Sequence, residues 1–177
     1  MITVVTAPER IEFPKDCVKV FLAGGIQKCD EWQQKVIDLF KTNGESKNVY
    51  LMNPRRENFP IDDPNASYEQ IKWEFDMLEQ CDLFTMLFLD SESDQPICFY
   101  ELGRNIEKMK QRFPEDWMYR IVINCDDNFK RKNDVIIQTM LATGNHMWCR
   151  VVECPTDSLI RHHWVSISRR INNIKKG

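Results

Sequence analysis

Apolar runs alternate along this chain with segments of helical periodicity. Five runs have the length and the β-branched or aromatic content of buried strands, at residues 18–26, 49–53, 83–90, 119–125 and 147–152. Between and after these runs, apolar positions recur every three to four residues. This periodicity predicts helices over residues 30–41, 67–80, 96–113, 133–142 and 156–173.

Strands that alternate with helices predict a parallel sheet, because parallel neighbours need long crossover connections and the helices supply them. We therefore expect an α/β fold: a single flavodoxin-like, doubly wound domain over residues 1–177. Its five-stranded parallel sheet should have the order 2-1-3-4-5 and be flanked by helices on both faces. A chain of 177 residues, 42% of them hydrophobic, suits one core.

Charge and composition argue against several classes of function. The net charge is −3 and the basic residues form only short clusters, so we expect no nucleic acid polymer as a partner. No apolar run approaches the ~20 residues of a membrane span and no leader opens the chain, so we expect a cytoplasmic protein without a membrane partner. The seven cysteines include no Cys-x-x-Cys pair, so we expect reduced thiols, no metal and no other cofactor.

Doubly wound sheets bind ligands beyond the carboxyl ends of their strands. After the first run, Gly24 and Gly25 would let a ligand approach the backbone closely, although a plain tight turn fits the same pattern. After the second run, Asn53 and Arg55 offer hydrogen-bond donors for sugar hydroxyls or a carboxylate, but ordinary surface roles explain them equally well.

Two glutamates lie on the helices that adjoin these segments. In the predicted helix 67–80, Ile71 and Phe75 belong to the expected apolar face, Trp73 points elsewhere, and Glu74 lies at the margin of that face. Desolvation at such a margin would raise the pKa of Glu74, which suits a proton donor, whereas a salt-bridged glutamate is the competing interpretation.

Glu101 follows an acidic loop and lies early in the predicted helix 96–113, beside Gly103. A carboxylate there would lie where α/β proteins do chemistry, and the helix dipole would weakly favour the ionised state that a nucleophile needs. A solvent-facing helical glutamate is the competing interpretation.

Four segments, taken in order, resemble the nucleoside 2-deoxyribosyltransferase-like superfamily, and the resemblance covers about residues 18–150. They are Val20-Phe21-Leu22-Ala23-Gly24-Gly25-Ile26, Asn53-Pro54-Arg55-Arg56, Gln70-Ile71-Lys72-Trp73-Glu74 and Glu101-Leu102-Gly103-Arg104. The resemblance implies a flavodoxin-like fold and an enzyme that cleaves the N-glycosidic bond of a 2′-deoxynucleoside. Nucleosides and nucleobases are the small-molecule partners that it implies.

The resemblance also implies roles for single residues. Glu101 would attack the sugar C1′ and hold the sugar covalently until a second base displaces it. Asp94 is the closest match to the acid that protonates the leaving base, and Glu74 corresponds to a further carboxylate of the site. The residues expected to bind substrate within one subunit are Phe21, Gly24, Gly25, Ile26, Gln27, Asn53 and Arg55.

Members of the superfamily complete each site with a polar residue from a neighbouring subunit, and Asn145 lies in the matching segment. This implies a homo-oligomer with sites at subunit interfaces. Asn145 is equally well explained as a helix-stop residue beside Gly144.

Three functional interpretations remain open from the residues. The sugar could pass to another base, which makes the protein a transferase, or to water, which makes it a (deoxy)nucleoside or nucleotide N-glycosidase. The resemblance implies that nucleotide-cleaving members bind the 5′-phosphate with a serine and backbone amides near the glutamate. Ser91 and Ser93 are near Glu101 in the sequence, but Pro96 removes one amide donor, which favours nucleosides. A non-catalytic nucleotide-binding module is the third interpretation.

Overall fold

The structure is a computed structural model, and it describes residues 1–60, 62–144, 150–152 and 154–174. The strands are β1 (Ile2–Thr6), β2 (Cys17–Gly24), β3 (Asn48–Asn53), β4 (Leu83–Phe88), β5 (Ile121–Asp126) and β6 (Arg150–Val152). The helices are α1 (Trp32–Asn43), α2 (Ala66–Gln80), α3 (Pro96–Arg112), α4 (Lys132–Ala142) and α5 (Thr156–Asn173), with a 3₁₀ turn, η1 (Trp117–Arg120). The helices begin and end within two residues of the predicted ranges.

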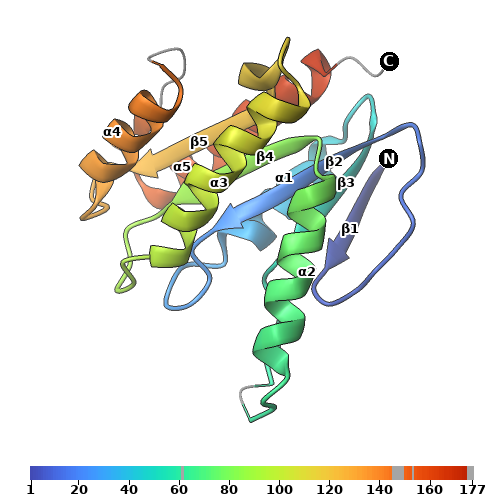
Figure 1. The fold of residues 1–177 in the computed structure, drawn as a ribbon, viewed down its shortest axis with the longest axis horizontal. Helices are drawn as coiled ribbons and strands as arrows, with labels where there is room; N and C mark the ends of the chain where they lie inside the picture. Colours follow the sequence, from blue (N-terminus) through green and yellow to red (C-terminus); the bar gives the residue numbers. More distant parts are fainter. Residues whose placement is uncertain (61, 145–149, 153, 175–177) are drawn as a thin grey trace.

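The strands form one parallel sheet in the order β1-β3-β2-β4-β5-β6 (Figure 1). The order from β3 to β6 is the 2-1-3-4-5 order of a flavodoxin-like fold, which confirms the predicted fold class. The structure adds β1, which pairs with β3 at the edge of the sheet. Every residue of β1 is β-branched, and this signal could have identified the strand from the sequence.

Alternating side chains of the strands supply two separate cores. Val18, Val20 and Leu22 of β2 pack with α1 and α5 on one face. Phe21 and Ala23 of the same strand pack with α2, α3 and α4 on the other face. The sheet is therefore covered on both sides by its crossover helices, as the period-two alternation of a strand requires.

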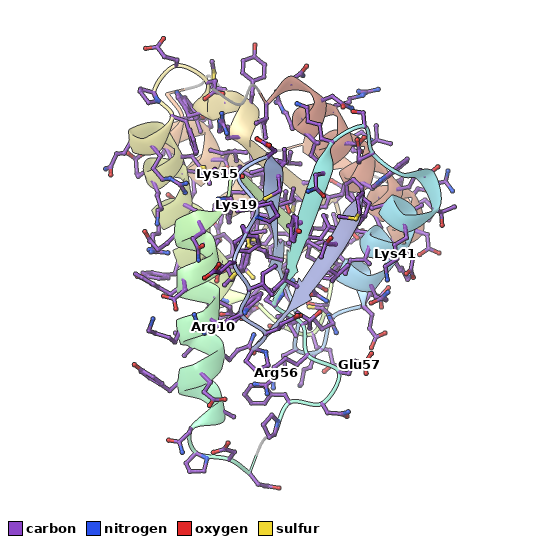
Figure 2. The ribbon with its side chains drawn as sticks, turned by 90° about the vertical axis from the view of Figure 1, so that its right-hand side faces the viewer. Arg10, Lys15, Lys19, Lys41, Arg56 and Glu57 are labelled. Carbon is purple, nitrogen blue, oxygen red and sulfur yellow. The ribbon has the colours of Figure 1, made fainter. Side chains whose placement is uncertain are left out.

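Helix α2 buries a different face from the one that the helical wheel suggests. Trp73 is fully buried, whereas Ile71 and Phe75 are 64% and 49% exposed, so the prediction for this face was wrong. The segment between β1 and β2 explains the difference, because the backbone carbonyl of Glu9 accepts a 2.6 Å hydrogen bond from the Trp73 indole. Arg10 of that segment lies beside α2 and pairs with Asp76 at 2.7 Å (Figure 2).

The helices that the structure describes include none long and apolar enough to cross a membrane. Cys29, Cys81, Cys98 and Cys154 are free thiols.

Candidate active site

A cavity of about 260 Å³ lies beyond the carboxyl ends of β2 and β4. The chain leaves β2 toward β3 on one side and later enters β4 on the other, so this is the point where the strand order reverses. Ligands of doubly wound folds bind at such a point. The volume is just under the roughly 300–1,000 Å³ typical of small-molecule sites, so the cavity suits a small molecule.

One wall of the cavity is the loop that follows β2, residues 24–30, which we call the glycine loop. Gly24, Gly25, Ile26 and Gln27, which the resemblance implied as substrate contacts, line the cavity together with Phe21. Gly24 has φ 149°, and a Cβ there would come closer than 3.0 Å to the Leu87 carbonyl oxygen. The first glycine is therefore required by its backbone conformation and by the close approach of β4.

Glu101 lies in the second turn of α3 and lines the opposite wall. The pKa of its carboxyl group is raised to about 8, mainly by burial and also by the negative charge of Glu74, while the positive charge of Arg104 opposes both effects. The sequence suggested a weakly favoured ionised state, but burial outweighs the helix dipole here. Without a ligand, Glu101 therefore retains its proton at neutral pH.

Glu74 of α2 lines the same cavity and burial raises its pKa, although the face on whose margin the sequence placed it is exposed at Ile71 and Phe75. The Gln70 amide opposes this shift, because its Nε2 donates a 2.8 Å hydrogen bond to Glu74 Oε1. The same Nε2 donates to the Pro54 carbonyl oxygen at 2.7 Å and so ties α2 to the end of β3. The site thus contains two partly buried carboxyl groups, one from each of two helices.

The packing of α2 on α3 determines how these two carboxyl groups face each other. Glu79 of α2 forms ion pairs with Arg104 and Lys108 of α3. The Arg104 guanidinium group also lies over the Phe75 ring, 4.4 Å from its centroid. These contacts join the two helices one to two turns away from the cavity.

Gln95 is a cavity residue that the sequence did not reveal. It precedes α3 with the left-handed angles φ 49° and ψ 50° and is 3% exposed. Its Nε2 donates hydrogen bonds to the Leu89 carbonyl oxygen (2.8 Å) and to Ser91 Oγ (3.3 Å), which fixes the orientation of the amide. Its Oε1 is buried and has no hydrogen-bond partner in the part of the chain that the structure describes.

Asp94 does not line the cavity. Its side chain is 61% exposed and pairs with Lys130 at 3.1 Å. The neighbouring residues explain this orientation, because Ser93 and Gln95 both line the cavity. Ser93 Oγ accepts a 3.2 Å hydrogen bond from the backbone N–H of Gln95. The structure therefore does not bring Asp94 together with Glu101.

Asn53 and Arg55 are also not among the residues that line the cavity. Asn53 is buried, and its Oδ1 accepts a 3.0 Å hydrogen bond from the Arg55 backbone amide within a turn. The Arg55 guanidinium group donates to Gln33 and to carbonyl groups of the glycine loop. Asn145, the remaining predicted contact, lies outside the described residues.

The charge of the cavity restricts its ligands. No lysine, arginine or histidine is among the described residues that line it, whereas Glu74 and Glu101 both are. Cys98 also lines it, but burial and the nearby Glu101 raise the pKa of its thiol, so it is not a thiolate nucleophile. The described residues also include no cluster of three or more His, Cys, Asp or Glu side chains suited to a metal ion.

Fold and cavity together define an α/β protein with a small-molecule site at the switch point of a doubly wound sheet. The family model described as "Nucleoside 2-deoxyribosyltransferase like" matches residues 17–113, more than half of the chain. The protein belongs to this family. The match begins at the first residue of β2 and includes every residue that lines the cavity. A search of the curated proteins found no match.

Proposed function

We propose that the protein is a nucleoside 2-deoxyribosyltransferase. In this proposal Glu101 cleaves the N-glycosidic bond of a 2′-deoxynucleoside and the sugar then passes to another nucleobase. The observation that carries the proposal is the pair of partly buried glutamates with raised pKa values, Glu101 and Glu74, that line one small cavity. The family match supports the nucleoside class of the substrate.

In the first step, the Glu101 carboxylate attacks the sugar C1′ as the bond from C1′ to the base nitrogen breaks. Glu74 gives its proton to the leaving base, so the products are a neutral base and a deoxyribosyl ester of Glu101. The proposal gives this role to Glu74 rather than to Asp94, because Glu74 lines the cavity and Asp94 points away from it.

The shared burial of the two carboxyl groups favours a pair that holds a single proton, because two buried like charges repel each other. The reactive form has an ionised Glu101 and a protonated Glu74. Positive charge that develops on the sugar ring in the transition state favours this form, since it stabilises the Glu101 carboxylate.

In the second step, the N–H of an incoming base loses its proton to the Glu74 carboxylate while the base nitrogen attacks C1′. The ester bond breaks and the Glu101 carboxylate is restored. Two successive inversions retain the configuration at C1′. Water in place of the second base would make the protein an N-glycosidase with the same nucleophile.

The cavity favours nucleosides over nucleotides, because its described lining carries no cation for a 5′-phosphate. The Ser91 hydroxyl, considered from the sequence as a phosphate ligand, is used within its own loop. It donates to the Ser93 carbonyl oxygen at 3.1 Å and accepts a hydrogen bond from the Gln95 side chain at 3.3 Å.

We further propose a homo-oligomer in which a neighbouring subunit covers the mouth of the cavity and contributes Asn145. Exposed apolar side chains beside the cavity support this. Ile97, which lines it, is exposed, and so are Tyr100 on α3 and Ile71 on α2. Apolar surface of this kind at the edge of a site is typical of a contact surface.

Incubation with deoxyinosine and free adenine, followed by chromatography of bases and nucleosides, tests the proposal. Formation of deoxyadenosine together with hypoxanthine supports transfer. Hypoxanthine without a new nucleoside supports the N-glycosidase. Glu101→Gln should abolish both reactions, and ligand binding without turnover in the unaltered protein would make it a binding module instead.

A further inference from the structure

The side chain of Arg55 holds the glycine loop at its base. Arg55 follows β3, the neighbour of β2, and so reaches the loop from the side. Its Nη2 donates hydrogen bonds to the carbonyl oxygens of Gly25 at 3.4 Å, Cys29 at 3.2 Å and Asp30 at 2.8 Å. Contacts to both ends of the segment 25–30 close it into a compact turn.

Arg55 is itself fixed in orientation. Its Nε donates a 3.0 Å hydrogen bond to Oε1 of Gln33, a fully buried residue of α1. Its backbone amide donates to Asn53 Oδ1 at 3.0 Å. The guanidinium group therefore joins the end of β3 and the start of α1 to the loop between β2 and α1.

The glycine loop needs such a support, because its backbone is strained at Lys28. Lys28 has φ 58°, in the left-handed region that residues with a Cβ rarely adopt, and such residues persist where the surroundings hold them. From the start of α1, the Trp32 indole donates to the Gly25 carbonyl oxygen at 3.1 Å. Arg55 is the residue that also binds the carbonyl groups beyond Lys28.

We infer that Arg55 is a positioning residue: by binding three carbonyl groups of the glycine loop, it holds the wall against which the substrate packs and does not touch the substrate itself. The inference rests on the proposed function and deepens it, since it gives Arg55 a role in place of the substrate contact expected from the sequence. A lysine should not replace it, because an ammonium group is a point charge and lacks the planar fork that reaches several acceptors.

Limited proteolysis tests the structural half of the inference. Lys28 is the only lysine or arginine in the loop 24–30, and its side chain is 62% exposed. In Arg55→Gln, trypsin should cut after Lys28 about tenfold faster or more. The loop must open locally to be cut, and in the variant this opening does not have to break the hydrogen bonds to the guanidinium group. Arg55→Lys should also be cut faster than the unaltered protein.

Two controls separate local opening from general unfolding. Cleavage after Lys19, which lies within β2, requires the sheet to open and should not accelerate. Arg56→Gln changes the next residue in the chain, whose guanidinium group lies over the Phe59 ring, 5.5 Å from its centroid. It should leave the cutting rate at Lys28 unchanged.

Steady-state kinetics test the functional half. For deoxynucleoside cleavage, Arg55→Gln should lower kcat/KM about 10–100-fold with a raised KM, because the displaced wall no longer orients the substrate. A mere loss of folded enzyme would lower kcat at an unchanged KM. Arg55→Lys should not restore the loss, and Arg56→Gln should stay within about twofold of the unaltered enzyme.

Equal cutting at Lys28 in Arg55→Gln and the unaltered protein would overturn the inference. So would faster cutting with unchanged kcat and KM, because the position of the wall would then be irrelevant to the reaction. If the unaltered protein cleaves no nucleoside, the proposed function fails, and the tryptic rates alone decide whether Arg55 holds the loop.

Discussion

At the scale of single residues, the two cavity glutamates should titrate as a pair. Both have raised pKa values because both are buried, and the charge of Glu74 contributes to the pKa of about 8 at Glu101. We expect kcat/KM for nucleoside cleavage to pass through a maximum and to fall above about pH 8, where the pair loses its shared proton.

Glu74→Gln tests the pairing. The variant cannot deliver a proton, so the rate should fall about 10²–10⁴-fold, and the pKa of Glu101 should drop because a negative charge is removed. The alkaline decline near pH 8 should therefore disappear from the pH profile of the residual activity. A profile with the same shape as that of the unaltered enzyme would show that Glu74 carries no proton in the reaction.

The raised pKa of Glu101 also predicts how stability changes with pH. Between about pH 4.5 and 8, the unfolded chain has released a proton that the folded protein keeps, so the free energy of unfolding falls as pH rises. Glu101→Gln has no carboxyl group to titrate at this position, so its free energy of unfolding should not show this fall with rising pH. Urea denaturation should find the variant more stable by on the order of 3 kcal/mol above pH 8 and little changed near pH 4.

Glu79→Gln is the matched control for this measurement. Hydrogen bonding to Lys108 lowers the pKa of Glu79, so this carboxylate contributes stability above its unfolded pKa and loses it in acid. Its replacement should lower stability at neutral pH, opposite in sign to Glu101→Gln. The same sign for both variants would contradict the assigned direction at Glu101.

The sequence predicted Glu101, Glu74 and the glycine pair as site residues because they belong to the segments that resemble the family. From the residues alone, an ordinary surface glutamate and a plain tight turn remained open. The sequence could not place Asp94 or Arg55. Asp94 lies in the irregular loop 89–95, where no periodicity indicates which side chains turn inward. For Arg55, the sequence cannot distinguish an arginine that binds the substrate from one that binds backbone carbonyl groups.

At the scale of elements, α2 shows where periodicity is insufficient. The helix has one apolar stripe through Trp73 and Met77, which is buried, and another through Tyr68, Ile71 and Phe75, which is exposed. Both stripes satisfy helical spacing. The choice between them is made by Phe21 on β2 and by the segment after β1, which are distant in sequence and pack against Trp73.

Two glycines of the site elements should respond to alanine in opposite ways. Gly24→Ala places a methyl group too close to the Leu87 backbone at φ 149°, so we expect a loss of about 2 kcal/mol or more. Gly103→Ala meets nothing within 4 Å in the middle of α3 and should stabilise the protein by about 0.5–1 kcal/mol. Thermal unfolding of both variants measures the contrast.

At the scale of the whole molecule, the order of five strands was predicted by analogy with flavodoxin-like sheets, which the alternation of strands and helices suggested. That order by itself placed the ends of β2 and β4 side by side and so located the cavity. It did not predict β1, since this strand precedes the alternating pattern and pairs at the outer edge of the sheet.

The proposed oligomer predicts complementation between inactive variants. Glu101→Gln and Asn145→Ala should each be nearly inactive alone. After subunit exchange in a dimer, mixed pairs contain one site in which both residues are intact, so equal amounts of the two variants should recover about a quarter of the full activity. A mixture as inactive as its components would place Asn145 outside the neighbour's site.

The ion pairs between α2 and α3 bear on redesign of the protein. Because Glu74 and Glu101 come from different helices, the gap between them depends on helix packing, and Glu79 bridges that packing through Arg104 and Lys108. In glycoside-cleaving enzymes the separation of two carboxyl groups selects between covalent capture and direct attack by water. In the proposed mechanism, changes at Glu79, more than one helical turn from Glu74, therefore offer a remote means of shifting the reaction between covalent capture by Glu101 and direct attack by water.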